Sequence, residues 1–179
     1  MLATQRLLLR TWKEADLAPF AALNGDPQVM EFFPKVLSRV ESDQRVAQIK
    51  EHFERHGFGL WAVEVEGVAD FIGFVGLNVP TFAAHFMPCV EIGWRLAREH
   101  WNQGYASDAA RAVVAFAFDE LRLDEIVALT AVGNQRSRRV MTRLGMTYSS
   151  GDDFEHPAFP EGHALRKHVL YRLSSSARR

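Results

Sequence analysis

The sequence predicts an α+β protein in which about four helices flank a mixed central β-sheet of about seven strands. Two observations favour this class. Short apolar stretches separated by turns, such as residues 60–65 and 71–79, come early and are typical of antiparallel hairpins. From residue 90 onward, strand and helix patterns alternate, which is typical of parallel strands joined by helices. Because both patterns occur, we expect a mixed sheet covered by helices.

The stretch from residue 91 to 121 is the most informative part of the chain. Apolar residues alternate with other residues from Val90 to Leu96, which indicates a strand with two different faces and places Glu91 opposite Ile92. A turn and a long helix pattern follow. The exposed stripe of this helix is narrow, so we expect most of its surface to be buried. The stripe consists of Asp108, Arg111, Ala115, Asp119 and Arg122.

The first turn of that helix has features of an anion-binding site. Its residues are small, and unpaired backbone N–H groups and the positive end of the helix dipole point the same way. A nucleoside-triphosphate loop and a Rossmann fingerprint are both excluded, because Gly104 is the only glycine between strand and helix and lysine is absent. Any phosphate would therefore be held mainly by backbone amides. An ordinary strand-to-helix turn explains this stretch equally well.

The other elements follow from apolar periodicity and turn residues. No repeat or linker interrupts the chain, so we interpret residues 1–173 as one domain and the polar residues 174–179 as a disordered tail. Further strands are expected at 6–12, 125–132, 146–149 and 168–173, and further helices at 13–23, 42–56 and 134–144.

The composition excludes several classes of function. The chain has 179 residues, 47% of them apolar and 24% charged, which is typical of a soluble globular protein. A net charge of −1 gives no electrostatic footprint for nucleic acid or an anionic membrane. No signal core or bilayer-spanning run is present, so we expect a cytoplasmic protein. We expect it to be a monomer or a homodimer. Cys89 is the only cysteine, which excludes an intrachain disulfide and a cysteine-based zinc site.

A second informative stretch opens the short helix near residue 134. Asn134 suits the N-cap position, and Ser137 shares the buried side of the helix with Met141. Ser137 is therefore either an inward-facing hydroxyl with a function or simply a first-turn residue. The exposed side of the helix is most simply a solvated face. It carries Arg136, Arg138, Arg139 and Arg143.

Several motifs occur in a fixed order along nearly the whole chain: RLLLR, DPQVMEFFP, FGLWAVE, FIGFVGL, VEIGWRL, HWNQGYASDAARA and NQRSRRVMTRLGM. Together they resemble the GNAT superfamily of acetyl-coenzyme A-dependent N-acetyltransferases. Within it, the chain is most similar to the branch of ribosomal-protein N-terminal acetyltransferases (RimJ/RimL-like). The superfamily pattern has Gln or Arg, two residues, Gly, one residue, then Gly or Ala. Trp101, Gly104 and Ala106 occupy those places here, so the first position departs from the pattern.

The resemblance implies a GNAT acyl-CoA N-acyltransferase fold, with acetyl-coenzyme A between two splayed parallel strands, 90–96 and 125–132. Backbone groups of the first strand would pair with the pantetheine arm, and backbone amides of the following turn would meet the pyrophosphate. By the family pattern Asn134 also contacts the cofactor, and Ser137 donates a proton to the departing thiolate. The expected backbone contacts are Trp94, Arg95, Leu96, Gln103, Gly104, Tyr105, Ala106 and Ser107.

In the implied reaction a neutral amine attacks the thioester carbonyl and expels a thiolate. α-Amines titrate near about 8 and lysine near about 10, so a base assists. Glu91 resembles the strand glutamate that some relatives use as base, and it can equally be a structural carboxylate paired with a cation. An acyl-cysteine intermediate on Cys89 is disfavoured, because the resemblance implies that acetyl groups are transferred directly.

We expect the acceptor to contact aromatic and titratable side chains elsewhere in the chain. Phe32, Phe33 and Trp61 can line a groove, although aromatic residues at such positions belong more often to the core. His156 and His163 lie in a late loop. They lack the partners of a metal site, so no metal is expected.

The predicted function is transfer of an acetyl group from acetyl-coenzyme A directly to a primary amine, foremost a protein or peptide N-terminal α-amine. Two alternatives stay open: acetylation of a small amine such as a drug, polyamine or amino-acid derivative, and a catalytically silent acyl-coenzyme A-binding module. The late loop, 152–162, is acidic, which would suit a cationic amine, although charged loops are usually just solvated. Its acidic residues are Asp152, Asp153, Glu155 and Glu161.

Overall fold

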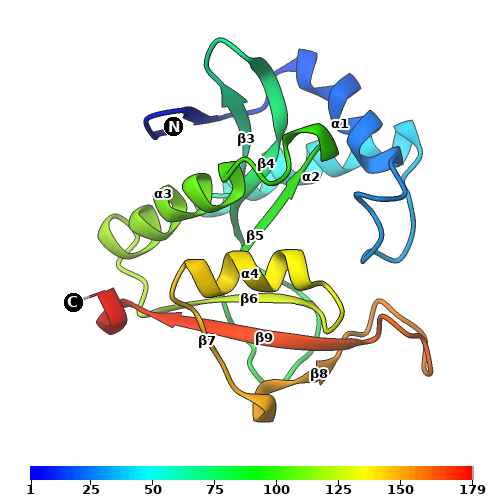
Figure 1. Ribbon diagram of the computed structural model, residues 1–179, viewed down its shortest axis with the longest axis vertical. Helices are drawn as coiled ribbons and strands as arrows, with labels where there is room; N and C mark the ends of the chain where they lie inside the picture. Colours follow the sequence, from blue (N-terminus) through cyan, green and yellow to red (C-terminus); the bar gives the residue numbers. More distant parts are fainter. Residues whose placement is uncertain (179) are drawn as a thin grey trace.

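The computed structural model describes residues 1–178, and residue 179, the last of the expected tail, lies outside the described residues. Nine strands form one sheet, with helices packed against it (Figure 1). The strands are β1 (Leu2–Ala3), β2 (Leu7–Arg10), β3 (Leu60–Val65), β4 (Ala69–Asn78), β5 (Glu91–Leu96), β6 (Glu125–Ala131), β7 (Thr147–Tyr148), β8 (Phe154–Glu155) and β9 (Lys167–Ser174). The α-helices are α1 (Leu17–Gly25), α2 (Arg39–His56), α3 (Tyr105–Asp119) and α4 (Gln135–Arg143).

The strands follow the order β1-β2-β3-β4-β5-β6-β9-β7, and β8 also pairs with β9. Neighbours are antiparallel except β5 and β6, which are parallel. The predicted α+β class with a mixed sheet and four helices is therefore confirmed. The sheet has more strands than expected because β1 and β8 are two residues long, too short to show a period of their own.

Helices cover both faces of the sheet. Successive side chains of β3 point to opposite faces, so Leu60 and Ala62 pack in one apolar cluster with residues of α1 and α2. Trp61 and Val63 pack in the other cluster, with residues of α3. Helix α4 lies against β6 and α3 (Figure 1). None of the helices in the described part of the chain is long and apolar enough to cross a membrane.

Two helix starts differ from the predicted ones because side chains cap them. Helix α2 begins three residues before the predicted Ser42, since Ser38 and Glu41 form a reciprocal capping box. The predicted helix from Lys13 begins instead as a 3-10 turn, in which the Asp16 carboxylate accepts the Lys13 N–H at 2.7 Å. At the C-terminus, Ser175–Arg178 form another 3-10 turn where a disordered tail was expected.

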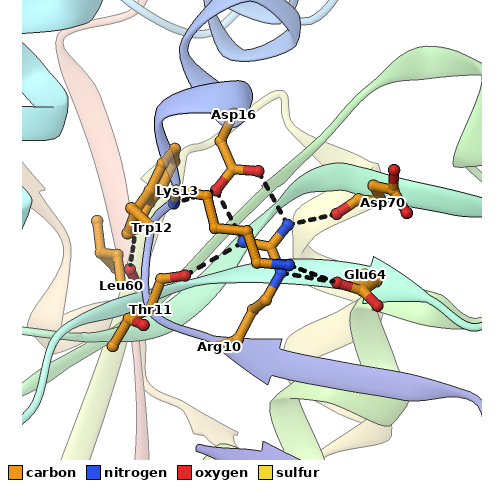
Figure 2. Close-up of polar contacts among 8 residues, drawn as sticks. All are labelled: Arg10, Thr11, Trp12, Lys13, Asp16, Leu60, Glu64 and Asp70. Atoms are coloured by element: carbon orange, nitrogen blue, oxygen red, sulfur yellow. Dashed lines mark hydrogen bonds and ion pairs between the residues drawn. The ribbon is translucent and has the colours of Figure 1, made fainter.

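A buried ion-pair network joins the start of the chain to the sheet (Figure 2). Arg10 donates from Nη1 and Nη2 to the Asp16 carboxylate at 2.8 and 2.9 Å, and from Nε to Glu64 at 2.7 Å. It also donates to the carbonyl groups of Thr11 and Asp70. The side chains of Arg10 and Asp16 are only 6% and 2% exposed. Every nitrogen of this guanidinium therefore has a partner, as a buried charge requires.

We predict that Arg10→Met destabilises the protein by about 3 kcal/mol or more, because it leaves the Asp16 carboxylate buried without its cation. Urea denaturation monitored by circular dichroism measures this loss. The matched control is Arg39→Gln, which removes an exposed arginine from its helical pair with Asp43 and should change the midpoint little. Equal midpoints for Arg10→Met and wild type would contradict a stabilising role.

Candidate active site

The strands β5 and β6 part almost as soon as they meet. One residue pair joins them, Glu91 with Val127, and the Val127 N–H donates to the Val90 carbonyl at 2.9 Å. Beyond this pair the two strands diverge, as Figure 1 shows. On their outer edges both remain paired, β5 with β4 and β6 with β9. The divergence therefore opens a gap inside a continuous sheet.

Backbone alternation decides which groups of β5 face this gap. The Ala97 N–H donates to the carbonyl of Ile72, a β4 residue. In an antiparallel ladder every second residue points its backbone N–H and C=O groups to the same neighbour, so Arg95, like Ala97, directs these groups toward β4. The intervening residues, such as Trp94, direct theirs toward the gap. The Leu96 carbonyl accepts the Trp101 indole N–H at 2.8 Å. Trp94 thus fits the expected backbone contact, whereas the Arg95 backbone and the Leu96 carbonyl are already paired.

A cavity of about 590 Å³ occupies the gap and the adjoining surface. Its walls come from β5, the first turns of α3 and α4, the loop before α2 and the loop between β8 and β9. Both expected catalytic residues, Glu91 and Ser137, line it. The expected cofactor contacts that line it are Trp94, Arg95, Leu96, Gly104, Tyr105, Ala106, Ser107 and Asn134.

The start of α3 opens into this cavity. Gly104 is the N-cap with φ of +84°, a left-handed conformation that favours glycine, and it offers no side chain to cap the helix. The N–H groups of Tyr105, Ala106 and Ser107 therefore remain available to an anion. Gln103, also expected to contact the cofactor, does not line the cavity, and its carbonyl accepts hydrogen bonds from Arg6 at 3.2 Å.

The start of α4 forms the opposite wall. Asn134 caps this helix: its Oδ1 accepts the Ser137 N–H at 3.2 Å, and its Nδ2 donates to the Thr130 hydroxyl at 3.0 Å. The half-buried Ser137 hydroxyl has no hydrogen-bond partner among residues 1–178. Asn134 therefore positions the turn, and the Ser137 hydroxyl is free to meet a ligand.

Three arginines of α4 also line the cavity, and sequence reasoning assigned them to a solvated face. Arg136 packs over the Trp101 ring at 4.5 Å and pairs with Glu31 at 2.7 Å. Arg139 and Arg143 have no ion-pair partner within the described chain. The successive spacings of three and four residues between Arg136, Arg139 and Arg143 were visible in the sequence, but only the fold shows that this side of α4 borders the cavity.

Glu91 lies at the point where β5 and β6 separate. It pairs with Asn78 across the β4–β5 ladder, and the Asn78 side chain is hydrogen-bonded to it. Burial raises the pKa of Glu91 to about 7, while the positive charge of Arg45 and the Asn78 hydrogen bond act in the opposite direction. A carboxylate that titrates near neutrality is suited to accept a proton at physiological pH. Neither Asn78 nor Arg45 was found from the sequence, because both are distant along the chain.

The thiol of Cys89 is unsuited to carry an acyl group. Burial, together with the nearby charge of Glu91, raises its pKa to about 11. The thiol donates to the Met87 sulfur at 3.4 Å, and Cys89 does not line the cavity. At neutral pH the reactive thiolate is therefore scarce, which supports direct transfer.

Of the side chains expected at the acceptor site, the structure brings Phe32, Phe33 and His156 to the cavity wall. Trp61 is not there: it is 3% exposed and packs edge-on against Phe53 and Phe116 in the core. This expectation was wrong because Trp61 occupies a strand position that faces α3. His163 is exposed and stacks on the Phe159 ring outside the cavity.

His168 was not predicted, yet it lines the cavity beside His156, with 4.8 Å between the ring centres. Burial lowers the pKa of His168 to about 4 and also lowers the pKa of His156. Both imidazoles are therefore neutral at physiological pH. Within the described chain no group of three or more potential metal ligands comes together.

The acidic residues of the late loop do not line the cavity, which disfavours the possible role with a cationic amine that the sequence left open. Asp152 pairs with Arg172 at 2.9 Å, and Glu155 pairs with Arg166 at 2.7 Å. Asp153 accepts a hydrogen bond from the Tyr148 hydroxyl at 3.2 Å. These carboxylates are therefore engaged in contacts within this part of the chain, and the Asp152 pair joins the loop to β9.

The comparisons with known proteins agree with this architecture. The acetyltransferase (GNAT) domain family matches residues 6–147, so the chain belongs to the GNAT acetyltransferases and is an acetyl-coenzyme A-dependent N-acetyltransferase. The uncharacterized protein YkkB of Bacillus subtilis is 34% identical over 149 residues, which cover 83% of this chain and 86% of YkkB. A crystal structure of a GNAT-family acetyltransferase from Bacillus anthracis superimposes with a TM-score of 0.80 at 25% identity, covering 98% of each chain.

Ribosomal-protein acetyltransferases also share this fold. The ribosomal-protein-S5-alanine acetyltransferase of Vibrio fischeri superimposes with a TM-score of 0.74, covering 97% of this chain and 95% of that chain. Its identity to this chain is 19%, so the likeness is one of fold. The RimJ/RimL-like branch therefore stays a prediction.

We predict that Gly104→Ala weakens coenzyme A binding by about tenfold or more, the loss of one hydrogen bond to a charged group. A methyl group at a positive φ shifts the cap and the N–H groups that follow it. Gly57→Ala is the matched control, because Gly57 has φ of +74° at the end of α2 and lies outside the cavity. Calorimetric titration of both variants should show weaker binding for Gly104→Ala alone. Equal coenzyme A affinities of wild type and Gly104→Ala would contradict a phosphate site at the start of α3.

Proposed function

We propose that this N-acetyltransferase acetylates an N-terminal α-amine of a peptide or protein, or a closely related primary amine, with Glu91 as base and Ser137 as acid. One observation carries the proposal. A carboxylate whose pKa is raised to about 7 shares one cavity with the open edge of β5, the uncapped start of α3 and a free hydroxyl.

The residues present suit acetyl-coenzyme A, which supplies an activated acetyl thioester when bound. Its pyrophosphate would be held by the N–H groups at the start of α3, and Arg139 and Arg143 add positive charge to the same cavity. Its pantetheine amides would be held by the backbone groups that Trp94 directs into the gap. Backbone donors and acceptors at a divided sheet need such partners.

The pKa of Glu91 favours an α-amine over a lysine side chain. An α-ammonium group titrates near about 8, whereas a lysine ammonium group titrates near about 10. A base with a pKa of about 7 therefore takes a proton from the α-amine with a much smaller energetic penalty. The Ser137 hydroxyl, on the opposite wall, is placed to return a proton to the leaving thiolate.

Acetylation of another small amine and a silent acyl-coenzyme A-binding module are the competing proposals. Release of free thiol from acetyl-coenzyme A, measured against a panel of α-amino peptides, amino acids, lysine side-chain analogues and polyamines, separates them. We expect release with α-amines and much less with polyamines. Release with none of these amines, from a protein that binds coenzyme A, would favour the silent module.

We predict that Glu91→Gln lowers kcat/KM at neutral pH by on the order of a hundredfold. In wild type, kcat/KM should rise with pH through about 7 as Glu91 loses its proton. The variant should lack that step and recover only as pH approaches the pKa of the acceptor amine. The comparison variant is Ser137→Ala, which should reduce turnover without removing the step near pH 7. Parallel pH profiles for wild type and Glu91→Gln would exclude Glu91 as the base.

The same substitution should leave a signature in stability. The folded-state pKa of Glu91 lies above its unfolded value, so its stabilising contribution is present in full at low pH and is lost as pH rises through about 7. Glu91→Gln removes this dependence and should melt at a higher temperature than wild type at pH 8, but not at pH 5. A lower melting temperature at both values would indicate a structural carboxylate.

A further inference from the structure

We propose that the acceptor amine carries a carboxylate, which Arg95 binds while the amine lies at Glu91. This inference rests on the proposed function, because it names the substrate class of the same cavity. It begins from the placement of Arg95. Arg95 is four residues after Glu91 in β5, so their side chains lie on the same face of the strand. Both residues line the cavity.

Arg95 is a desolvated cation with unused donors. Its Nη1 donates to the Asn24 side chain at 2.6 Å, while its buried Nε has no hydrogen-bond partner. The guanidinium packs 3.9 Å from the centre of the Phe33 ring. No carboxylate of residues 1–178 forms an ion pair with it. Desolvation, with repulsion from Arg45, lowers the pKa of Arg95 to about 9, so it remains charged at neutral pH.

Arg10 shows how the same protein treats a structural arginine. Its guanidinium meets two carboxylates, and each of its nitrogens donates a hydrogen bond. A cation left without an anion in a partly buried site costs stability, so it is retained where a ligand supplies the anion. The unused donors of Arg95 therefore point to an anionic ligand group.

The other charges of the cavity do not supply this anion. Arg45 lies within electrostatic reach of Glu91, so these two charges offset each other. His156 and His168 are neutral, and Glu31 is paired with Arg136. Uncompensated positive charge therefore remains on β5 at Arg95, as it does at Arg139 and Arg143 of α4. Such a site disfavours a polyamine, which would add further positive charge, and favours an amine that also bears a carboxylate.

The surface of β5 between Glu91 and Arg95 is not covered by other side chains. Gly93 lies between Glu91 and Arg95 on the same face of β5, and a Cβ there would meet no atom within 4 Å. The Cα atoms of Glu91 and Arg95 are about 13 Å apart along the strand, and both side chains extend into the cavity. A short amino acid, or a peptide whose second or third residue is acidic, fits this arrangement.

Matched pairs of acceptors test the proposal. Each pair differs only in a carboxylate replaced by a carboxamide: an amino acid against its amide, and a peptide with Asp against the same peptide with Asn. Free-thiol release gives kcat/KM for each acceptor. Wild type should prefer the carboxylate by on the order of tenfold to a hundredfold in at least one pair type. The preferred pair type identifies the source, free amino acid or acidic peptide.

Arg95→Met keeps an unbranched apolar side chain and removes the charge. It should abolish this preference by lowering kcat/KM for the carboxylate and changing that for the amide little. Arg98→Gln is the matched control, since Arg98 is an exposed arginine outside the cavity that donates to Gln28. It should keep the wild-type preference. A purely structural role of Arg95 predicts an equal loss for both members of each pair, which would overturn the inference.

Two further outcomes keep this inference separate from the proposed function. Acetylation of α-amines by wild type without any carboxylate preference would overturn the inference and leave the proposed function standing. If wild type shows no turnover, or if the Arg95 variant does not fold, ligand binding to wild type still tests the inference. Wild-type protein with coenzyme A should melt at a higher temperature with N-acetylated amino acids or acidic peptides than with their amides. Equal melting temperatures would also overturn the inference.

Discussion

The single residue pair that joins β5 to β6 is the constraint on which the site depends. Each strand keeps one saturated edge, against β4 or β9, and turns its other edge into the gap. Backbone N–H and C=O groups at such an edge require partners. A ligand with amide groups of its own can supply them, which is why we propose that the cofactor binds where the sheet divides.

Two buried or half-buried arginines show how charge is distributed between stability and function. Arg10 is surrounded by carboxylates and carbonyl groups, and it joins β2 to β3 and to the turn before α1. Arg95 and Glu91 lie in the cavity with their charges only partly compensated. The protein therefore pairs the buried charge of Arg10 fully and leaves that of Arg95 without a carboxylate, in the cavity where we propose that the substrate binds.

The sequence predicted those features that arise from neighbouring residues. The strand–turn–helix from Glu91 to the end of α3 was found because its period and its glycine are local signals. Partners distant in the chain were missed, since no periodicity links Arg45 or Asn78 to Glu91. Trp61 was misplaced for a related reason: alternation along β3 is clear, but which face meets α3 depends on the whole sheet. The RimJ/RimL-like branch and the residue roles remain predictions.

The register of β5 couples the two halves of the proposed chemistry. Its residues 92, 94 and 96 turn their side chains toward α3 and their backbone groups into the gap, while Glu91 and Arg95 do the reverse. A slip of one residue would bury both charges under α3 and close the cofactor edge. Gly73 permits the observed register, because its φ of +136° and a Cβ position only 2.2 Å from the Arg95 carbonyl allow only glycine there. In this register the Arg95 side chain lines the cavity while the Trp94 backbone faces the gap, so the proposed amine and cofactor contacts arise from alternate residues of one strand.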